Sequence, residues 1–292
     1  MKAQLALLVA LSAIVAISLL LTSSALGAPQ ISFGSSSVTT TGAGSSASHG
    51  VATKVFASGG AVVSCGQAKI ALGAAGNFRV LAGTTVTNTG NTVVKGNLGV
   101  SPGTAITGFG PGKVTGTIHA GDTAAAAAQT DLVTAYNDGM GRTNCPTAVA
   151  GNLGGQTLGP GLYKSTSSLS ISSGDLTLTA HGHPGAVFIF QVASKFTTTS
   201  GRHVYLSAGA QAANIYWVIG SSATLGTTSV VFGNILAHKS ISLATGAVLH
   251  GKALAHLGAV TLAGNIVYRH APFLGATASV AGSTSGRARP GA

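Results

Sequence analysis

The chain has 292 residues, of which 7% are charged, and its 15 Lys and Arg against 4 acidic residues give a formal net charge of +11. Polysaccharide hydrolases and lyases need paired carboxylates or a calcium cluster, so this shortage of acids argues against an enzyme. The basic residues are mostly single and lack interleaved aromatics, which excludes a typical nucleic-acid surface.

The N-terminal segment has the pattern of a secretory signal. Lys2 provides a short basic start, residues 5–21 are apolar, and small residues precede a cleavage point at Ala28. We therefore expect residues 1–27 to be removed and the protein to be secreted. The apolar run is also long enough to stay uncleaved and anchor the protein at the cell surface, and a membrane contact is expected only in that case.

The segments at both ends of the mature chain have few large side chains. Residues 28–67 are dominated by Ser, Gly, Thr and Ala and are predicted to be a flexible spacer, and residues 272–292 are predicted to be a disordered tail. The two cysteines, Cys65 and Cys145, form a disulfide or stay as free thiols, and the sequence leaves both outcomes open.

A helix is predicted at about residues 122–139. Asp122 is a suitable N-cap, an alanine run follows, and Leu132 and Tyr136 fall on one apolar stripe. Gly139 and Gly141 are interpreted as the stop signal. Because its side chains are small, this helix is expected to lie closely along a sheet.

The remainder of the central domain, which we place at residues 68–271, reads as strands. The continuous apolar segments 187–190 and 215–219 are typical of strands covered on both sides, and we expect both, including Trp217, on the face that the helix covers. Gly-Asn-Leu-Gly occurs at residues 96–99 and again at 151–154, which suggests two equivalent coils.

Residues 222–238 and 240–256 can be superposed at an offset of 18 residues, with eight of seventeen pairs identical. A period near 18 is too short for helical-hairpin repeats and propeller blades, and it suits one turn of a β-solenoid. The predicted fold is therefore mainly β, with three-faced coils of 18 or more residues and one long α-helix packed alongside.

Several stretches between residues 71 and 268 resemble the microbial ice-binding (antifreeze) proteins. They are Leu72 to Phe78 with Leu81-Ala82-Gly83, Gly96 to Gly103, Ile118 to Asp122, Asp131-Leu132 through Tyr136-Asn137-Asp138, Ala186 to Gln191 and Ser221 to Thr227. The resemblance implies an irregular right-handed β-solenoid in which the coils do not follow strict sequence order. It also implies adsorption to the ice crystal surface and inhibition of ice growth or recrystallisation.

The outward positions of the repeated coils form the candidate ice-binding face. Hydroxyl groups anchor water, threonine methyl groups order neighbouring water, and β-branching limits side-chain motion. The outward column contains Ser222, Thr224, Ser240, Ser242, Ala259 and Thr261, with Thr227 and Thr245 at its edge and Thr197 and Thr199 as an extension. The inward column is expected to contain the apolar residues that alternate with them.

The main alternative is a noncatalytic cell-surface or matrix protein that binds polysaccharide or another protein with the same faces. The excess of cations also suits anionic cell-wall polymers as weak partners. An exposed aromatic column would favour sugar binding, but Tyr163, Tyr205, Tyr216, Tyr268 and Trp217 form no repeated column in the sequence.

We expect no cofactor and no metal site. His238 and His256 are stacked by the repeat, but the pair lacks an evident third ligand. Asp131 and Asp138 are interpreted as solvated helix residues and not as catalytic acids.

Overall fold

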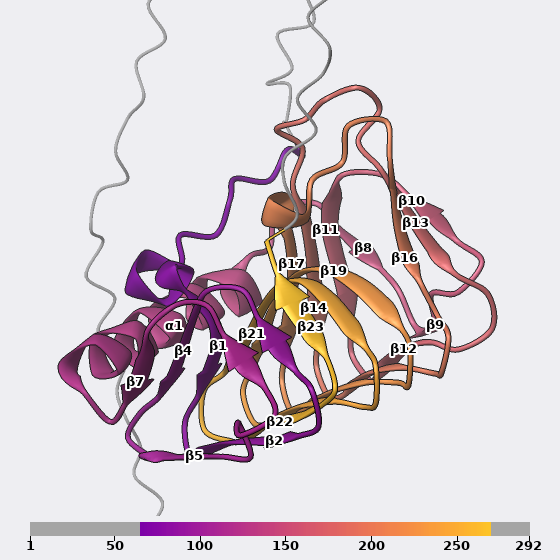
Figure 1. Cartoon of the computed structure of the whole chain (residues 1–292). Coiled ribbons are helices and arrows are strands. Elements are labelled where there is room, and N and C mark those ends of the chain that lie inside the picture. Colours follow the sequence, from indigo (N-terminus) through magenta and orange to yellow (C-terminus); the bar gives the residue numbers. More distant parts are fainter. Residues whose placement is uncertain (1–64, 270–292) are drawn as a thin grey trace, which may run out of the picture. The chain divides into compact units, whose positions relative to one another are not determined.

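The computed structural model describes residues 65–269, which form a stack of short strands and one long helix (Figure 1). The predicted signal segment at residues 1–27, most of the predicted spacer at 28–67 and the predicted tail at 272–292 lie outside the described residues. Within the described part, no helix is long and apolar enough to cross a membrane.

The strands form three sheets. The 12-stranded sheet contains β6 (Lys113–Val114), β3 (Val93–Val94), β23 (Ile266–Tyr268), β21 (Val248–Ala255), β19 (Val230–Ala237), β17 (Ile215–Ile219), β14 (Phe188–Val192), β11 (Gly161–Ser165) and β8 (Pro146–Ala148), with β1 (Phe78–Ala82), β4 (Asn97–Val100) and β7 (Ile118–Ala120) joined to it through β21. The 8-stranded sheet has the order β5 (Ala105–Thr107), β2 (Thr85–Thr89), β22 (Val260–Ala263), β20 (Ile241–Leu243), β18 (Ala223–Leu225), β15 (Phe196–Thr198), β12 (Leu169–Ile171) and β9 (Gly151–Asn152). The 3-stranded sheet contains β10 (Thr157–Leu158), β13 (Leu176–Thr179) and β16 (Val204–Ser207).

The helices are α1 (Thr123–Gly141) and the short 3-10 turns η1 (Gly73–Asn77) and η2 (Ala212–Asn214). Neighbouring coils pair in parallel, and residues 230–237 of β19 align with residues 248–255 of β21, as the offset of 18 requires. Strand β19 also spans two faces, because Val230 bridges to His203 beside β16 while Asn234 pairs with Tyr216 of β17. We call the surface formed by β10, β13, β16 and the first halves of β19 and β21, continued by β23, β3 and β6, the third face.

The coils do not follow sequence order, as the resemblance implied. Strand β2 pairs with β22, and β1 pairs with β21, so the first strands of the described chain stack on the last ones. Helix α1 then carries the chain back along the stack to β8 at the opposite end (Figure 1). The two Gly-Asn-Leu-Gly stretches are not equivalent, because Asn97 begins β4 in the 12-stranded sheet whereas Asn152 ends β9 in the 8-stranded sheet.

Two apolar layers hold the 12-stranded sheet in place. Phe188, Phe190 and Trp217 point into the solenoid interior, and Ile189 and Val218 pack toward the helix. The prediction that both apolar segments lie under α1 is confirmed for the strands. It is wrong for the side chain of Trp217, which points into the solenoid interior and not toward the helix. A strand covered on both faces is apolar at every position, so its sequence does not reveal which side chains point inward.

The interior is anchored by stacked aromatic rings. The centroid of the Trp217 ring lies 4.2 Å from that of Phe190 and 4.5 Å from that of Phe196, and Tyr163 stacks on Phe190 at 5.0 Å. The indole N–H of Trp217 donates to the carbonyl oxygen of Phe232 at 3.0 Å, which satisfies the one polar atom of this buried side chain. These contacts tie three successive coils together.

Helix α1 begins as predicted and ends two residues later than predicted. The carboxylate of Asp122 accepts a hydrogen bond from the amide of Ala125 at 2.9 Å, which is an N-cap interaction. Gly139 lies inside the helix and is buried, and a Cβ atom there would lie 2.8 Å from Cγ2 of Val218. This glycine therefore allows close approach of helix and sheet and does not stop the helix, which ends at Gly141, the second glycine of the predicted stop signal.

The two helix aspartates have different surroundings. The carboxylate of Asp131 accepts a hydrogen bond from the amide of Ala74 in η1 at 2.7 Å, so its interpretation as a solvated residue was wrong. Asp138 is exposed and forms an ion pair with Arg142 at 2.7 Å. Asp131 thus fastens the segment before β1 to the helix, a contact between parts of the chain too distant for pattern reasoning.

Candidate functional site

The 8-stranded sheet carries a column of hydroxyl side chains that has one member on each of seven neighbouring strands. We call this set the hydroxyl column, and strand register aligns its members in the order Ser170, Thr197, Thr224, Ser242, Thr261, Thr87 and Thr107. With strands about 4.8 Å apart, the column extends over about 29 Å. It contains four of the predicted residues, namely Thr197, Thr224, Ser242 and Thr261.

The side chains next to the hydroxyl column point the opposite way, as predicted. Ala223 and Leu225 flank Thr224 and are buried, and Val260 and Leu262 flank Thr261 in the same manner. Both threonines are exposed. Since the backbone on either side of each threonine is fixed by core packing, its side chain has a defined position on the sheet.

Three members of the hydroxyl column were not among the predicted residues. Ser170 lies in a longer coil before the 18-residue repeat of residues 222–256, and Thr87 and Thr107 precede the helix in sequence. All three therefore lie outside the repeat on which the prediction was based. The alternation of polar and apolar residues around Thr87 marks it as outward on a strand. Its place beside Thr261 follows only from the pairing of β2 with β22.

Ser222, Ser240 and Ala259 lie along one margin of the sheet, where the coils turn. The hydroxyl oxygen of Ser222 accepts a hydrogen bond from the amide of Ser240 at 3.3 Å, and that of Ser240 accepts from the amide of Ala259 at 3.3 Å. The hydroxyl group of each serine therefore links its coil to the main chain of the next coil. The exposed Lys195 occupies the corresponding position two residues before Thr197, so a charge borders this margin.

Thr199, Thr227 and Thr245 lie beyond the opposite ends of the strands. The hydroxyl of Thr199 donates to the carbonyl oxygen of Ser172 at 3.2 Å. Thr227 and Thr245 are exposed at the corner that follows β18 and β20. They flank the hydroxyl column and are not part of it.

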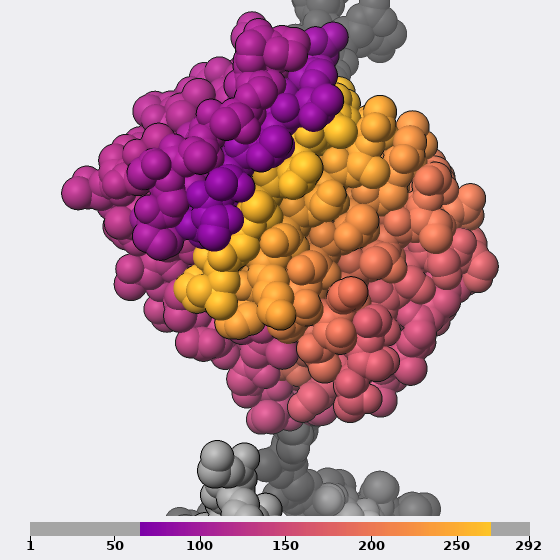
Figure 2. Space-filling model, turned by 90° about the horizontal axis from the view of Figure 1, so that it is seen from below, coloured from indigo at the N-terminus to yellow at the C-terminus, as the bar shows by residue number. Residues whose placement is uncertain are grey.

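The face formed by the 8-stranded sheet is uncharged, since none of its strands contains Lys, Arg, Asp or Glu. Figure 2 shows this side of the molecule as a broad surface in which the C-terminal coils lie directly beside the N-terminal strands. Such a surface offers hydroxyl and methyl groups to water over a wide area.

The third face has a different character. Phe232, His250 and Tyr268 lie in register on three neighbouring strands, with ring centroids 4.1 Å and 4.4 Å apart. The ammonium group of Lys95 lies over the Tyr268 ring at 5.4 Å. Tyr268 thus belongs to an aromatic column, but its partners are a histidine and a phenylalanine, which the prediction about the tyrosines and Trp217 did not consider.

In the described range, no group of three or more His, Cys, Asp or Glu residues is close enough to hold a metal ion. The rings of His238 and His256 lie 5.8 Å apart. Burial, together with the neighbouring His238, lowers the pKa of His256. This favours the neutral form of the His256 ring.

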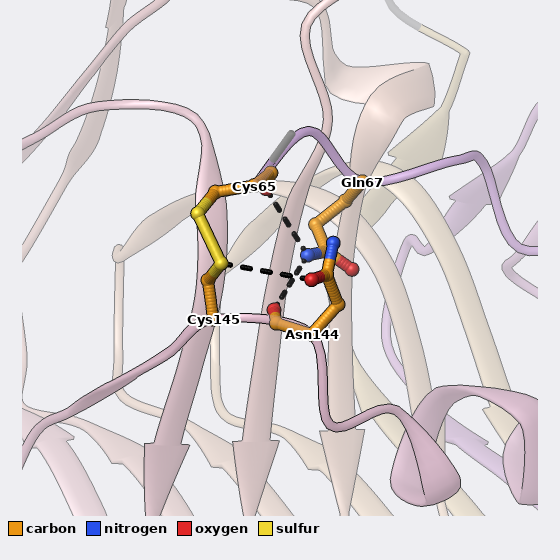
Figure 3. Close-up of a disulfide and its surroundings, with 4 residues drawn as sticks. All are labelled: Cys65, Gln67, Asn144 and Cys145. Carbon is orange, nitrogen blue, oxygen red and sulfur yellow. Dashed lines mark hydrogen bonds between the residues drawn. A yellow bond between two sulfur atoms is a disulfide. The ribbon is translucent and has the colours of Figure 1, made fainter. Parts of the chain in front are cut away.

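Cys65 and Cys145 are joined by a disulfide at the start of the described chain (Figure 3). Their Cα atoms are 5.4 Å apart and the bond closes a loop of 80 residues. The side-chain amide of Gln67 donates to the carbonyl oxygen of Asn144 at 2.9 Å and so adds a second link beside the disulfide. Together these links fasten the segment before β1 to the chain that follows α1.

Comparison with known proteins agrees with this architecture. A family described as Ice-binding-like matches residues 80–268. An ice-binding protein of Nostoc sp. (strain HG1) is 48% identical over 171 residues, which cover 59% of this chain and 63% of that protein. One of Flavobacterium frigoris (strain PS1) is 39% identical over 187 residues, covering 59% of this chain and 66% of that protein. The chain thus spans just under two thirds of the length of these two relatives.

Solved structures of ice-binding proteins have the same fold and are similar to this chain in sequence. The crystal structure of an ice binding protein from an Antarctic biological consortium is 53% identical, with a TM-score of 0.70 over 70% of this chain and 93% of that one. That of an ice-binding protein from the Antarctic ascomycete Antarctomyces psychrotrophicus is 39% identical, with a TM-score of 0.66 over 70% of this chain and 100% of that one. With the family match extending from β1 to β23, the chain belongs to the Ice-binding-like family.

Proposed function

We propose that the protein adsorbs to ice through its 8-stranded sheet and thereby inhibits ice growth or recrystallisation. The observation that carries this proposal is the hydroxyl column, seven side chains held in strand register on an uncharged sheet. Ice has no charge and no distinct chemical group, so a protein recognises it only through an extended surface that holds water in a regular arrangement.

The spacing of the sheet supports this proposal. Neighbouring strands place the column hydroxyls about 4.8 Å apart, and positions two residues apart along one strand are about 6.7 Å apart. Thr85, Thr87 and Thr89 occupy three such positions on β2. Their β-branched side chains are restricted at χ1, so holding them in one conformation against ice costs less side-chain entropy than holding mobile side chains.

A bulky substitution in the middle of the hydroxyl column tests the proposal. Thr224 is exposed on β18 between Thr197 and Ser242. The variant Thr224→Tyr raises a ring above the surface and is expected to lose ice-affinity partitioning, thermal hysteresis and recrystallisation inhibition. Thr157→Tyr places the same change at an exposed position of β10 on the third face and is the matched control.

Both variants are expected to keep the circular dichroism spectrum and melting temperature of the parent protein. Loss of ice activity in Thr224→Tyr alone supports the 8-stranded sheet as the ice-contacting face. Full activity in Thr224→Tyr, or loss in Thr157→Tyr alone, would remove this sheet from consideration. Exclusion of the parent protein from growing ice would overturn ice binding itself.

Secretion is part of the proposal, because ice outside the cell is reached only by an exported protein. The support is the signal pattern of residues 1–27, which lie outside the described range. N-terminal sequencing of the protein from the culture medium is expected to begin at Ala28. A retained Met1 would instead indicate an uncleaved anchor.

A glycan-binding role on the third face is the second candidate. The observation behind it is a row of partly exposed aromatic side chains, Phe232, His250 and Tyr268, in register on three strands of the third face. Retardation in gels that contain a neutral polysaccharide, lost in Tyr268→Ala and kept in Thr224→Tyr, would support this role. Equal mobility with and without polysaccharide would exclude it.

A further inference from the structure

A cavity of about 270 Å³ opens at the corner between the helix-covered sheet and the third face. Its lining includes Arg79 from β1, His250 and Lys252 from β21, and Arg269, which follows β23. These residues meet because β21 pairs with both β1 and β23. Three side chains that are cationic at neutral pH in solution thus line one small cavity.

The cations of this cavity have no carboxylate partner in the chain's side chains. The sequence contains four acidic residues, and all four are described and engaged elsewhere. Asp122 caps α1, Asp131 accepts from Ala74, Asp138 pairs with Arg142, and Asp175 lies near Arg202. The described residues contain no ion pair that involves Arg79, Lys252 or Arg269.

Lys252 is the innermost of the three, with 8% of its surface exposed. Its ammonium group donates to the carbonyl oxygens of Gly76 and Phe78, the latter at 3.0 Å. Burial first, and then the charges of Arg79 and Arg269, lower its pKa from 10.5 to about 7. Burial and Arg269 also lower the pKa of Arg79. The cavity therefore concentrates positive charge that an external anion would stabilise.

We propose that this cavity binds a tetrahedral oxyanion, phosphate or sulfate, between the guanidinium groups of Arg79 and Arg269 and the ammonium group of Lys252. Guanidinium groups bind such oxygens in a fork of two N–H donors, and a divalent anion offers enough oxygens for all three cations. Phosphate occurs as this free divalent ion and also, with one negative charge and two unesterified oxygens, as the phosphodiester of an anionic cell-wall polymer. This inference does not depend on ice binding.

Binding is expected to be coupled to proton uptake by Lys252. The charged and titratable side chains that line the cavity around it are Arg79, Arg269 and His250. Because a bound anion favours the charged ammonium, affinity is expected to fall as the pH rises from about 6 to about 9. Sulfate is the better probe for this series, since it keeps its double charge throughout the range.

The experiment is titration calorimetry of the full chain with sodium sulfate at millimolar concentration, against sodium chloride at equal ionic strength. Arg79→Gln and Arg269→Gln are each expected to weaken sulfate binding about tenfold or more, since each removes a charge-assisted hydrogen bond. Arg202→Gln is the matched control, because Arg202 lies 3.8 Å from Asp175 and outside the cavity. Arg269 is exposed after the last described strand, so its variant is expected to fold even if Arg79→Gln does not.

Two further arms identify the source of the anion. Retention on immobilised poly(glycerol phosphate) that is released by free phosphate supports a polymer-borne ligand, and sulfate or phosphate binding without polymer retention supports a free ion. Heats that equal those of chloride, together with no polymer retention, overturn the proposal. Sulfate binding that is undiminished in Arg269→Gln overturns the assigned site.

Discussion

The buried ammonium group of Lys252 makes an unusual pH dependence of stability testable. Its pKa is about 7 in the folded protein against an ordinary value of 10.5. Between these values the unfolded chain binds more protons than the folded one, so the free energy of unfolding is expected to rise with pH. Below pH 7 the ammonium group of Lys252 stays protonated in the fold, and the whole cost of burying its charge lowers the free energy of unfolding. As the pH rises above 7 the buried group loses its proton, and this cost decreases.

The size of the effect follows from the two pKa values. From about pH 7 to about pH 9.5, a single group with these values contributes a gain of about 3 kcal/mol. Burial raises the pKa of Tyr136, Tyr163 and Tyr216 above the ordinary value of 10.0. Near pH 10 these tyrosines therefore lose protons more readily in the unfolded chain, which lowers the free energy of unfolding. The interval stops at about pH 9.5 to keep this opposing effect small. In the chosen interval Lys252 is the main contributor to the slope.

Urea denaturation in chloride buffers across this interval measures the gain. Lys252→Met is expected to remove most of the rise, because its side chain has no ionisable group. Lys239→Met, at an exposed position one coil away, is the matched control and is expected to keep the slope of the parent protein. A flat profile in the parent protein, or an unchanged slope in Lys252→Met, would refute the assignment of the uncompensated charge to Lys252.

Three other variants test separate parts of the structure. Gly139→Ala is expected to lower stability by about 1 to 3 kcal/mol, because its Cβ would lie 2.8 Å from Cγ2 of Val218, and an unchanged melting temperature would contradict close packing there. Replacing Cys65 and Cys145 by serine opens an 80-residue loop and is expected to lower the free energy of unfolding by about 4 to 5 kcal/mol in urea denaturation. The parent protein with its disulfide reduced is the control and is expected to lose a similar amount. Thr87→Tyr is expected to weaken ice-affinity partitioning as Thr224→Tyr does, and full retention would place the N-terminal strands outside the ice-contacting face.

The sequence predicted the parts of the fold that repeat at a fixed offset. Thr224 and Ser242 are neighbours because one coil separates them, so the offset of 18 residues gives their register directly. The same logic identified Leu225 and Leu243 as inward residues. The helix start was predictable because the cap of Asp122 is a local interaction.

Contacts between distant segments were out of reach of this reasoning. Thr87 joins the hydroxyl column only because the first strands stack on the last coil. Asp131 was interpreted as solvated because its partner, Ala74, is 57 residues away in the sequence, with several strands between them. Arg79 and Lys252 are brought together by the pairing of β1 with β21, and no local pattern relates them.

The stacking of the first strands on the last coil also means that β1 and β2 cannot complete their pairing until the last coil has been made. Strands β1 and β2 are synthesised early, yet their partners β21 and β22 are among the last strands of the described chain. Such nonlocal pairing slows folding, and until it occurs the open edge of the last coil is a template for another chain. A protein truncated after α1 would have no place to dock its strands, and one that lacked β1 to β7 is expected to associate edge to edge.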